Sequence, residues 1–150
     1  MYNFYNNVTF EEGSLKAVGK NNGKIVAQEE FKSAGKPAKI ILSKSNPTIA
    51  NNWDDVSFIT ATIVDEKGTR CANADNLIQF SISNSGKLIG VDNGNIISHD
   101  NYQSPERHAY SGKAIAIVKA AQDAGKIEIK ASAEGLEAGS ILIEIVSDKK

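Results

Sequence analysis

The sequence predicts an all-β protein built as a β-sandwich, and three observations lead to this fold class. Apolar residues occur in short, often alternating runs, which is the spacing of strands. Glycine, asparagine, aspartate and serine separate these runs at fairly regular intervals. No stretch keeps helical spacing over three turns. Short strands that follow one another without helices are typical of a sandwich of two sheets.

The first strands are expected before residue 33. These are Val8–Phe10, Leu15–Gly19 and Lys24–Phe31. The segment Asn21–Gly23 predicts a hairpin between the last two, because asparagine and glycine adopt positive φ at low cost. The following segment, Ser33–Lys39, contains Gly35 and Pro37, which interrupt regular structure. We interpret this segment as a linker.

The strand pattern resumes after the linker. The expected strands are Ala38–Ser43, Ser57–Asp65, Leu77–Ile82, Lys87–Val91, Ala114–Ala120, Lys126–Ser132 and Ser140–Val146. Turns are expected at Glu66–Gly68 and at Ser83–Gly86. The strand Ser57–Asp65 has apolar residues on both faces, so we expect a central strand with little solvent on either side.

The strands before the linker are too few to enclose a core of their own. Either they join the main sandwich, or they are the C-terminal strands of a truncated preceding domain. The linker favours the second alternative, which divides the chain into residues 1–36 and 37–150. In that case one face of the N-terminal sheet lacks its partner. Val18, Ile25 and Phe31 are then expected to be unusually exposed, or to be covered by another copy.

Composition excludes several classes of partner. The formal net charge is -1 and no basic block occurs, so nucleic acid is not expected to bind. The apolar runs are much shorter than the ~20 residues of a membrane span, so no membrane partner is expected. The single cysteine, Cys71, excludes an internal disulfide.

Four segments, in this order, resemble a region near the C-terminus of family 2 glycoside hydrolases of the β-galactosidase type. They are FEEGSLKAVGKNNGKIVAQEEFKSAGKPAKIIL (residues 10–42), DDVSFITATIVDEKGTRCANADNLIQFSISNSGKLIGVDNGN (55–95), RHAYSGKAIAIV (107–118) and AGKIEIKASAEGL (124–136). The chain departs from the family pattern at Lys20, where an aromatic residue is common, and at Cys71, where proline or valine is more usual.

This resemblance implies an immunoglobulin-like (invasin-like) β-sandwich, with extra N-terminal strands from the end of a preceding immunoglobulin-like domain. It implies a bacterial parent enzyme, periplasmic or extracellular, that cleaves β-galactosides or related glycosides with two glutamates in an upstream barrel. This chain is then a non-catalytic accessory or scaffold domain, without a cofactor, whose partners are other domains of the same parent chain. The alternatives are a carbohydrate-binding module and an invasin-like bacterial surface domain.

The segment GVDNGN, residues 90–95, has to be tested as a calcium loop. Asp92, Asn93 and Asn95 offer oxygen ligands, but Gly94 breaks the alternation and no glutamate closes the loop. We interpret Asp92, Asn93 and Gly94 as a structural turn in which Asp92 accepts backbone N–H bonds. A long surface loop, Ile96–Ser111, is expected to follow. Its Arg107 is expected to tie loop carbonyls and Asp92 together.

No pattern of residues predicts catalysis or metal binding. The adjacent carboxylates, such as Asp54–Asp55, point to opposite faces of an extended chain and are interpreted as solvated surface. The histidines lack a third ligand at metal-like spacing. Trp53, Tyr102 and Tyr110 are candidates for sugar contact, because exposed aromatic rings stack on pyranose faces. The alternative is that Trp53 packs over one end of the sandwich.

Overall fold

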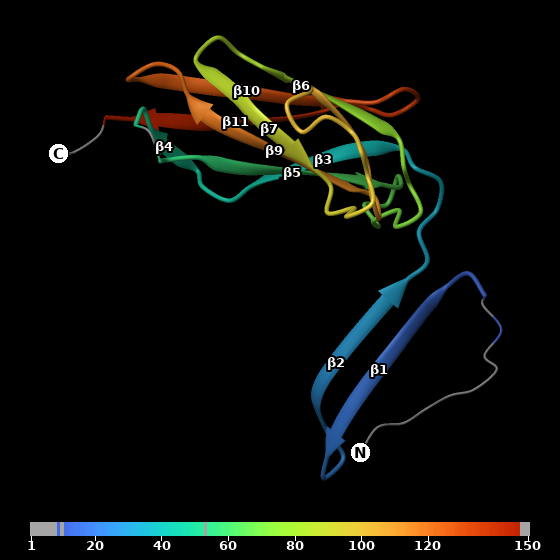
Figure 1. Ribbon diagram of the computed structural model, residues 1–150. Coiled ribbons are helices and arrows are strands. Elements are labelled where there is room, and N and C mark those ends of the chain that lie inside the picture. Colours follow the sequence, from blue (N-terminus) through green and yellow to red (C-terminus); the bar gives the residue numbers. More distant parts are fainter. Residues whose placement is uncertain (1–8, 10, 53, 148–150) are drawn as a thin grey trace. The chain divides into compact units, whose positions relative to one another are not determined.

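The computed structural model describes residues 9, 11–52 and 54–147 of the chain. These residues contain eleven strands and no helix, so the predicted all-β fold class is confirmed. The strands belong to two compact units, residues 1–33 and 34–150 (Figure 1). The sequence predicts the domain boundary after residue 36. In the structure Gly35 N donates to Asp65 Oδ2 over 2.8 Å, so contacts of the second unit begin before that residue.

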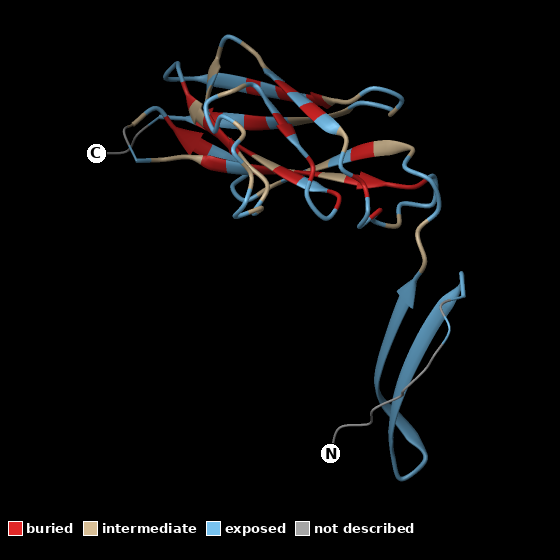
Figure 2. Cartoon of the chain, turned by 45° about the vertical axis from the view of Figure 1, so that its right-hand side comes forward, coloured by how far each residue is buried: buried red, intermediate tan, exposed pale blue. Residues whose placement is uncertain are grey.

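The first unit contains a single antiparallel hairpin of β1 (Ser14–Asn21) and β2 (Lys24–Lys32). Asn22 and Gly23 have φ of 49° and 78°, so the predicted hairpin turn is confirmed. Every residue of both strands is exposed (Figure 2). The apolar side chains of Leu15, Val18, Ile25, Val26 and Phe31 are between 41% and 73% exposed. The expected strand at residues 8–10 lies outside the described residues, except for Thr9, which is in no strand.

The second unit is a sandwich of two sheets (Figure 1). One sheet has the order β3-β5-β9-β7 and the other β4-β11-β10-β6-β8. The bounds are β3 (Lys39–Lys44), β4 (Thr48–Ala50), β5 (Ser57–Val64), β6 (Leu77–Ile82), β7 (Gly86–Asp92), β8 (Glu106–His108), β9 (Lys113–Ala120), β10 (Gly125–Ser132) and β11 (Gly139–Val146). Without the short β4 and β8, seven described strands remain in this unit. One sheet is then β3-β5-β9-β7 and the other is β11-β10-β6. This is the arrangement of the immunoglobulin fold.

The core lies between the two sheets and is mainly aliphatic. Its most buried large side chains include Ile49, Ile59, Ile63, Ile78, Val91, Val118, Ile127, Ile129 and Ile143. Strand β5 is central in its sheet, as predicted, but the expectation of little solvent on both faces is wrong. Its Ile59 and Ile63 are fully buried, whereas Phe58 is 46% exposed. The other face is covered unevenly, because Thr60 and Thr62 on it are partly exposed and Val64 at its end is only 3% exposed.

Two strands were not predicted, and both have three residues. Strand β4 pairs in parallel with β11, and β8 pairs with β6. The expected uninterrupted loop Ile96–Ser111 is therefore wrong over Glu106–His108. A three-residue strand is too short for its alternation to be recognised, and a charged residue at its centre hides the buried position.

The loop after β7 covers the outer edge of that strand. Val91 N donates to Tyr102 O over 2.8 Å, which satisfies an N–H at an otherwise unpaired edge. A β-bulge at Leu88–Gly90 brings the strand close to the loop. A Cβ added at Gly90 would lie 3.4 Å from Tyr102 O, so the absence of a side chain permits this approach. The loop between β7 and β8 therefore packs against the edge of the sandwich.

Candidate functional site

Arg107 is the centre of a polar cluster that holds this loop. It is the middle residue of β8, and its side chain is fully buried. Nη1 donates to Asp100 O over 3.0 Å, and Nη2 donates to Asn93 Oδ1 over 3.1 Å. Nη2 also lies 3.5 Å from Asp92 Oδ1. One guanidinium group therefore contacts the beginning and the middle of the loop.

Tyr102 lies against the same guanidinium group. The central carbon of Arg107 is 4.7 Å from the centroid of the Tyr102 ring, within the range of a cation–π contact. Tyr102 is nevertheless 52% exposed. Within the described part of the chain, Arg107 Nε is buried and has no hydrogen-bond partner. Tyr102 therefore contacts the buried cluster and is also about half exposed to solvent.

The turn at residues 92–95 is held by local hydrogen bonds. Asp92 Oδ1 accepts from the backbone N–H of Asn93 at 2.7 Å and of Gly94 at 3.2 Å. Gly94 has a φ of 75°, a conformation that glycine adopts at low cost. Asn93 Nδ2 donates to His108 O over 2.8 Å, so the turn is also tied to β8. The side chains of Asp92 and Asn93 therefore stabilise the turn and its connection to β8.

The other sugar-contact candidates do not join this cluster. Tyr110 pairs through its main chain with Lys113, is 50% exposed, and makes no side-chain hydrogen bond within the described ranges. Trp53 lies outside the described residues. The structure therefore brings Tyr102 together with Arg107, Asp92 and Asn93, and leaves Tyr110 apart from their contacts.

Asp65 is a buried carboxylate that the sequence argument did not single out. It directly follows β5, and its two oxygens accept from Gly35 N and Thr69 N, each at 2.8 Å. These two backbone donors hold the pKa of Asp65 below its usual range. The pattern Asp-x-x-Gly at residues 65–68, directly after a strand, is the signal that indicates this turn.

Cys71 lies close to this carboxylate in the fold and is buried. Burial raises the pKa of its thiol, and the negative charge of Asp65 acts in the same direction. A thiol with a raised pKa has little of the thiolate that reacts. Within the described ranges, no three His, Cys, Asp or Glu side chains are grouped to hold a metal ion. The described residues also contain no helix that is long and apolar enough to cross a membrane.

The fold and the site define an immunoglobulin-like sandwich domain with a structured loop at its edge. Comparison with known families makes this class specific, because residues 40–142 match the family described as glycoside hydrolase family 2 C-terminal domain 5. The match covers well over half of the chain. The chain belongs to this family, and the resemblance found from the four sequence segments is confirmed.

Curated relatives agree with the family match. The chain is 37% identical over 129 residues to a Bacteroides ovatus protein named beta-galactosidase BoGH2A, which covers 86% of this chain and 15% of that protein. It is 35% identical over 86 residues to a beta-galactosidase of Thermoanaerobacter pseudethanolicus, covering 57% of this chain and 12% of that protein. The chain thus spans only a small part of the length of the relatives it matches.

Solved structures show the same fold. A family 2 glycosyl hydrolase from Bacteroides cellulosilyticus matches with a TM-score of 0.87 and 34% identity, over 95% of this chain and 18% of that one. A beta-glycosidase from Bacteroides vulgatus matches with a TM-score of 0.85 and 30% identity, over 91% of this chain and 18% of that one. The chain is therefore a C-terminal domain of the kind found in family 2 glycoside hydrolases.

Proposed function

We propose that this chain is a non-catalytic accessory domain of a β-galactosidase-like glycoside hydrolase and packs against other domains of the same polypeptide. Two relatives named beta-galactosidase support the substrate class. The small share of each relative that the chain covers supports the presence of other domains. A periplasmic or extracellular location of the parent enzyme, which rests on the family resemblance, belongs to the same proposal.

The match to a C-terminal domain family is the observation that carries the proposal, and the state of Asp65 agrees with a non-catalytic role. A glycosidase needs two carboxyl groups across a bound sugar, and its general acid needs a raised pKa. Asp65 is the buried carboxylate of the described residues, and its pKa is lowered rather than raised. Both of its oxygens already accept backbone N–H groups. This carboxylate stabilises a turn and is poorly suited to donate a proton.

The exposed hairpin supports packing against other domains. Strands β1 and β2 form a two-stranded sheet, which is marginal as an independent structure. Leu15 and Phe31 are 73% and 62% exposed, although side chains of this kind are normally covered. We include in the proposal that these strands complete a preceding immunoglobulin-like domain, whose remaining strands cover their apolar side chains.

Removal of residues 37–150 from the parent enzyme tests the accessory role. We expect kcat on an aryl β-galactoside to stay within a few-fold of the intact enzyme, because the deletion removes no catalytic carboxylate. Thermal stability should fall, because surfaces that the domain covers become exposed. A folded deletion variant, judged by circular dichroism, that has lost turnover by several orders of magnitude would contradict the proposal.

Sugar binding is a second candidate function, and Tyr102 favours it. The residue is 52% exposed, and its contact with the Arg107 guanidinium restricts the ring before any ligand arrives. Titration of the labelled chain with β-linked oligosaccharides at millimolar concentration separates the two candidates. An accessory domain should show no saturable chemical-shift change at Tyr102, Tyr110 or Trp53. Saturable changes that disappear in Tyr102→Ala would establish a binding module.

A further inference from the structure

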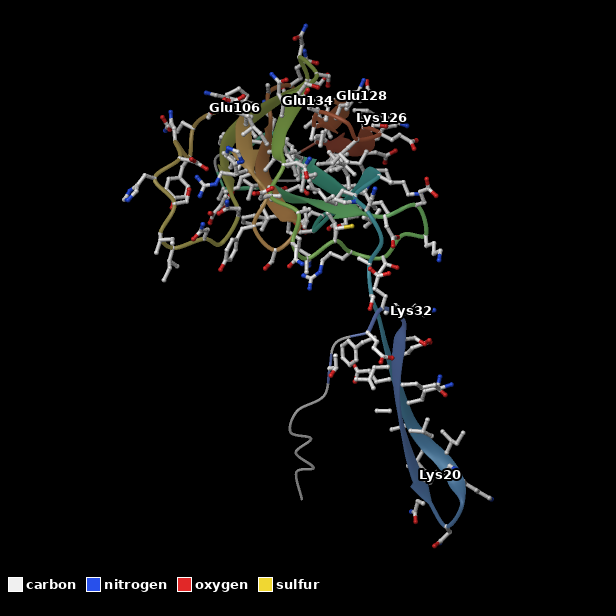
Figure 3. The ribbon with its side chains drawn as sticks, turned by 90° about the vertical axis from the view of Figure 1, so that its right-hand side faces the viewer. Lys20, Lys32, Glu106, Lys126, Glu128 and Glu134 are labelled. Carbon is white, nitrogen blue, oxygen red and sulfur yellow. The ribbon has the colours of Figure 1, made fainter. Side chains whose placement is uncertain are left out.

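The tip of the loop between β7 and β8 consists of two adjacent isoleucines, Ile96 and Ile97. They are 97% and 77% exposed, more than any other large hydrophobic residue described in the second unit. Figure 3 shows this loop at the side of the sandwich, with Glu106, the first residue of β8, at its end. Single exposed apolar residues are common, but here two adjacent aliphatic side chains are both largely exposed.

The tip is held in place before any partner binds. Asn95 Oδ1 accepts from Ile97 N at 3.2 Å, and Asn95 O accepts from Ser98 N at 3.1 Å. Asn95 is itself fixed by a bond from its N–H to Asn93 Oδ1 at 2.9 Å, and the same oxygen accepts from Arg107. The buried guanidinium group therefore supports the turn that carries the tip. A preorganised loop loses little conformational freedom on docking.

The chemistry of the loop fits a protein surface. Residues 93–105 carry one formal charge, that of Asp100, in a chain in which 23% of residues are charged. Depletion of charge is characteristic of the centres of protein interfaces. The tip itself is aliphatic, whereas sugars stack on flat aromatic rings. An apolar depression on another folded protein surface is the complementary partner.

We propose that the Ile96–Ile97 tip docks into an apolar surface of another folded domain of the same polypeptide. This inference rests on the proposed function and identifies the surface by which the domain packs. Stable contacts between separate molecules bury ~1,200–2,000 Å² in total, of which a two-residue tip supplies only a small fraction. A domain linked in the same chain is present at a high effective concentration, so a small contact is sufficient. The matched region is 15–18% of the similar proteins, which leaves ample chain for such a domain.

Hydroxyl-radical footprinting of Ile96 and Ile97 tests this inference. Oxidation is compared between the chain of residues 1–150 and the parent enzyme that contains it. We expect at least fivefold less oxidation of both residues in the parent. Ile96→Ser/Ile97→Ser should make the parent more sensitive to proteolysis between domains, because the anchor is lost. Leu142→Ser is the matched control, since Leu142 is 49% exposed on β11 and lies away from the loop in sequence.

Each other outcome overturns the docking inference. Protection in the 1–150 chain that rises with protein concentration would assign the tip to a second copy. Protection that needs an added β-linked oligosaccharide would assign it to sugar binding. Equal oxidation in chain and parent would show that nothing covers the tip. Equal oxidation would not contradict the accessory role. That role is tested separately, by the turnover of the parent enzyme that lacks residues 37–150.

Discussion

Replacement of Arg107 by alanine removes the group that joins the loop to the sandwich. The variant loses the hydrogen bonds to Asp100 O and Asn93 Oδ1, the ion pair with Asp92 and the contact with the Tyr102 ring. It also leaves a space where a fully buried side chain stood. The sandwich core itself is unchanged, so the chain should still fold.

The expected loss of stability is about 2–4 kcal/mol. A hydrogen bond to a charged group contributes about 1.5–3 kcal/mol, and two such bonds are lost. The ion pair adds less than about 1 kcal/mol, because the side chain of Asp92 is 49% exposed and water screens it. The variant also lacks the Arg107 Nε–H group, which is buried without a partner among the described residues. Because burial of an unpaired N–H is unfavourable, its removal offsets part of the lost stability.

Urea unfolding of the wild type and the variant, followed by circular dichroism, measures this loss of stability. Hydrogen exchange in residues 93–105 should accelerate, because the turn and the tip lose their common support. Arg107→Lys is the control. It keeps the charge but not the planar pair of donors, and should recover less than half of the loss. A change below about 1 kcal/mol, with unchanged exchange in the loop, would refute the assignment of Arg107 as the support of this loop.

Two further predictions concern the turn at Asp65 and the packing at Gly86. Because the folded pKa of Asp65 is lowered, its contribution to stability is complete above the unfolded value of about 4 and is lost as pH falls through the folded value. The difference in urea midpoint between wild type and Asp65→Asn should therefore shrink between pH 6 and pH 3, and an equal difference at both would contradict the assignment. Gly86→Ala should destabilise the domain by about 1–3 kcal/mol, because an added Cβ would lie 2.5 Å from Ile127 Cγ2 and 3.0 Å from Ile82 Cγ2. Gly94→Ala is the comparison, since it meets no atom within 4 Å and has only the strain of its positive φ. Equal urea midpoints of Gly86→Ala and the wild type would show that the core relaxes freely.

Most strands could be predicted because alternation and burial coincide in them. In β10 the inward Ile127 and Ile129 are buried, whereas the alternating polar residues Lys126, Glu128 and Lys130 are exposed. The same logic failed in β5 at Phe58, which is 46% exposed although its neighbours Ile59 and Ile63 are fully buried. Hydrophobicity indicates that a residue prefers to be buried, but the sequence does not reveal whether a second layer covers it.

The candidate site was less accessible to sequence reasoning. The pattern Asp-Asn-Gly indicates a turn locally, so Asp92, Asn93 and Gly94 could be placed. The burial of Arg107 depends on contacts with residues 92, 93, 100 and 102, which only the folded chain brings together. A charged residue in a short strand has no periodicity that marks it as buried. Asp65 was placed at the end of an expected strand, and its burial depends on backbone bonds from Gly35 and Thr69 that the sequence does not reveal.

Turnover by the isolated chain is the measurement that tests the central claim most directly. Residues 1–150 are purified and assayed with an aryl β-galactoside at a concentration at which the parent enzyme gives readily measured hydrolysis. The chain should give no hydrolysis above the buffer rate, because the family resemblance places the two catalytic glutamates in an upstream barrel, and the described residues of this chain contain strands and no helix. Hydrolysis that survives repurification and is lost in Asp92→Asn or Asp54→Asn would contradict the claim that this domain has no catalytic role.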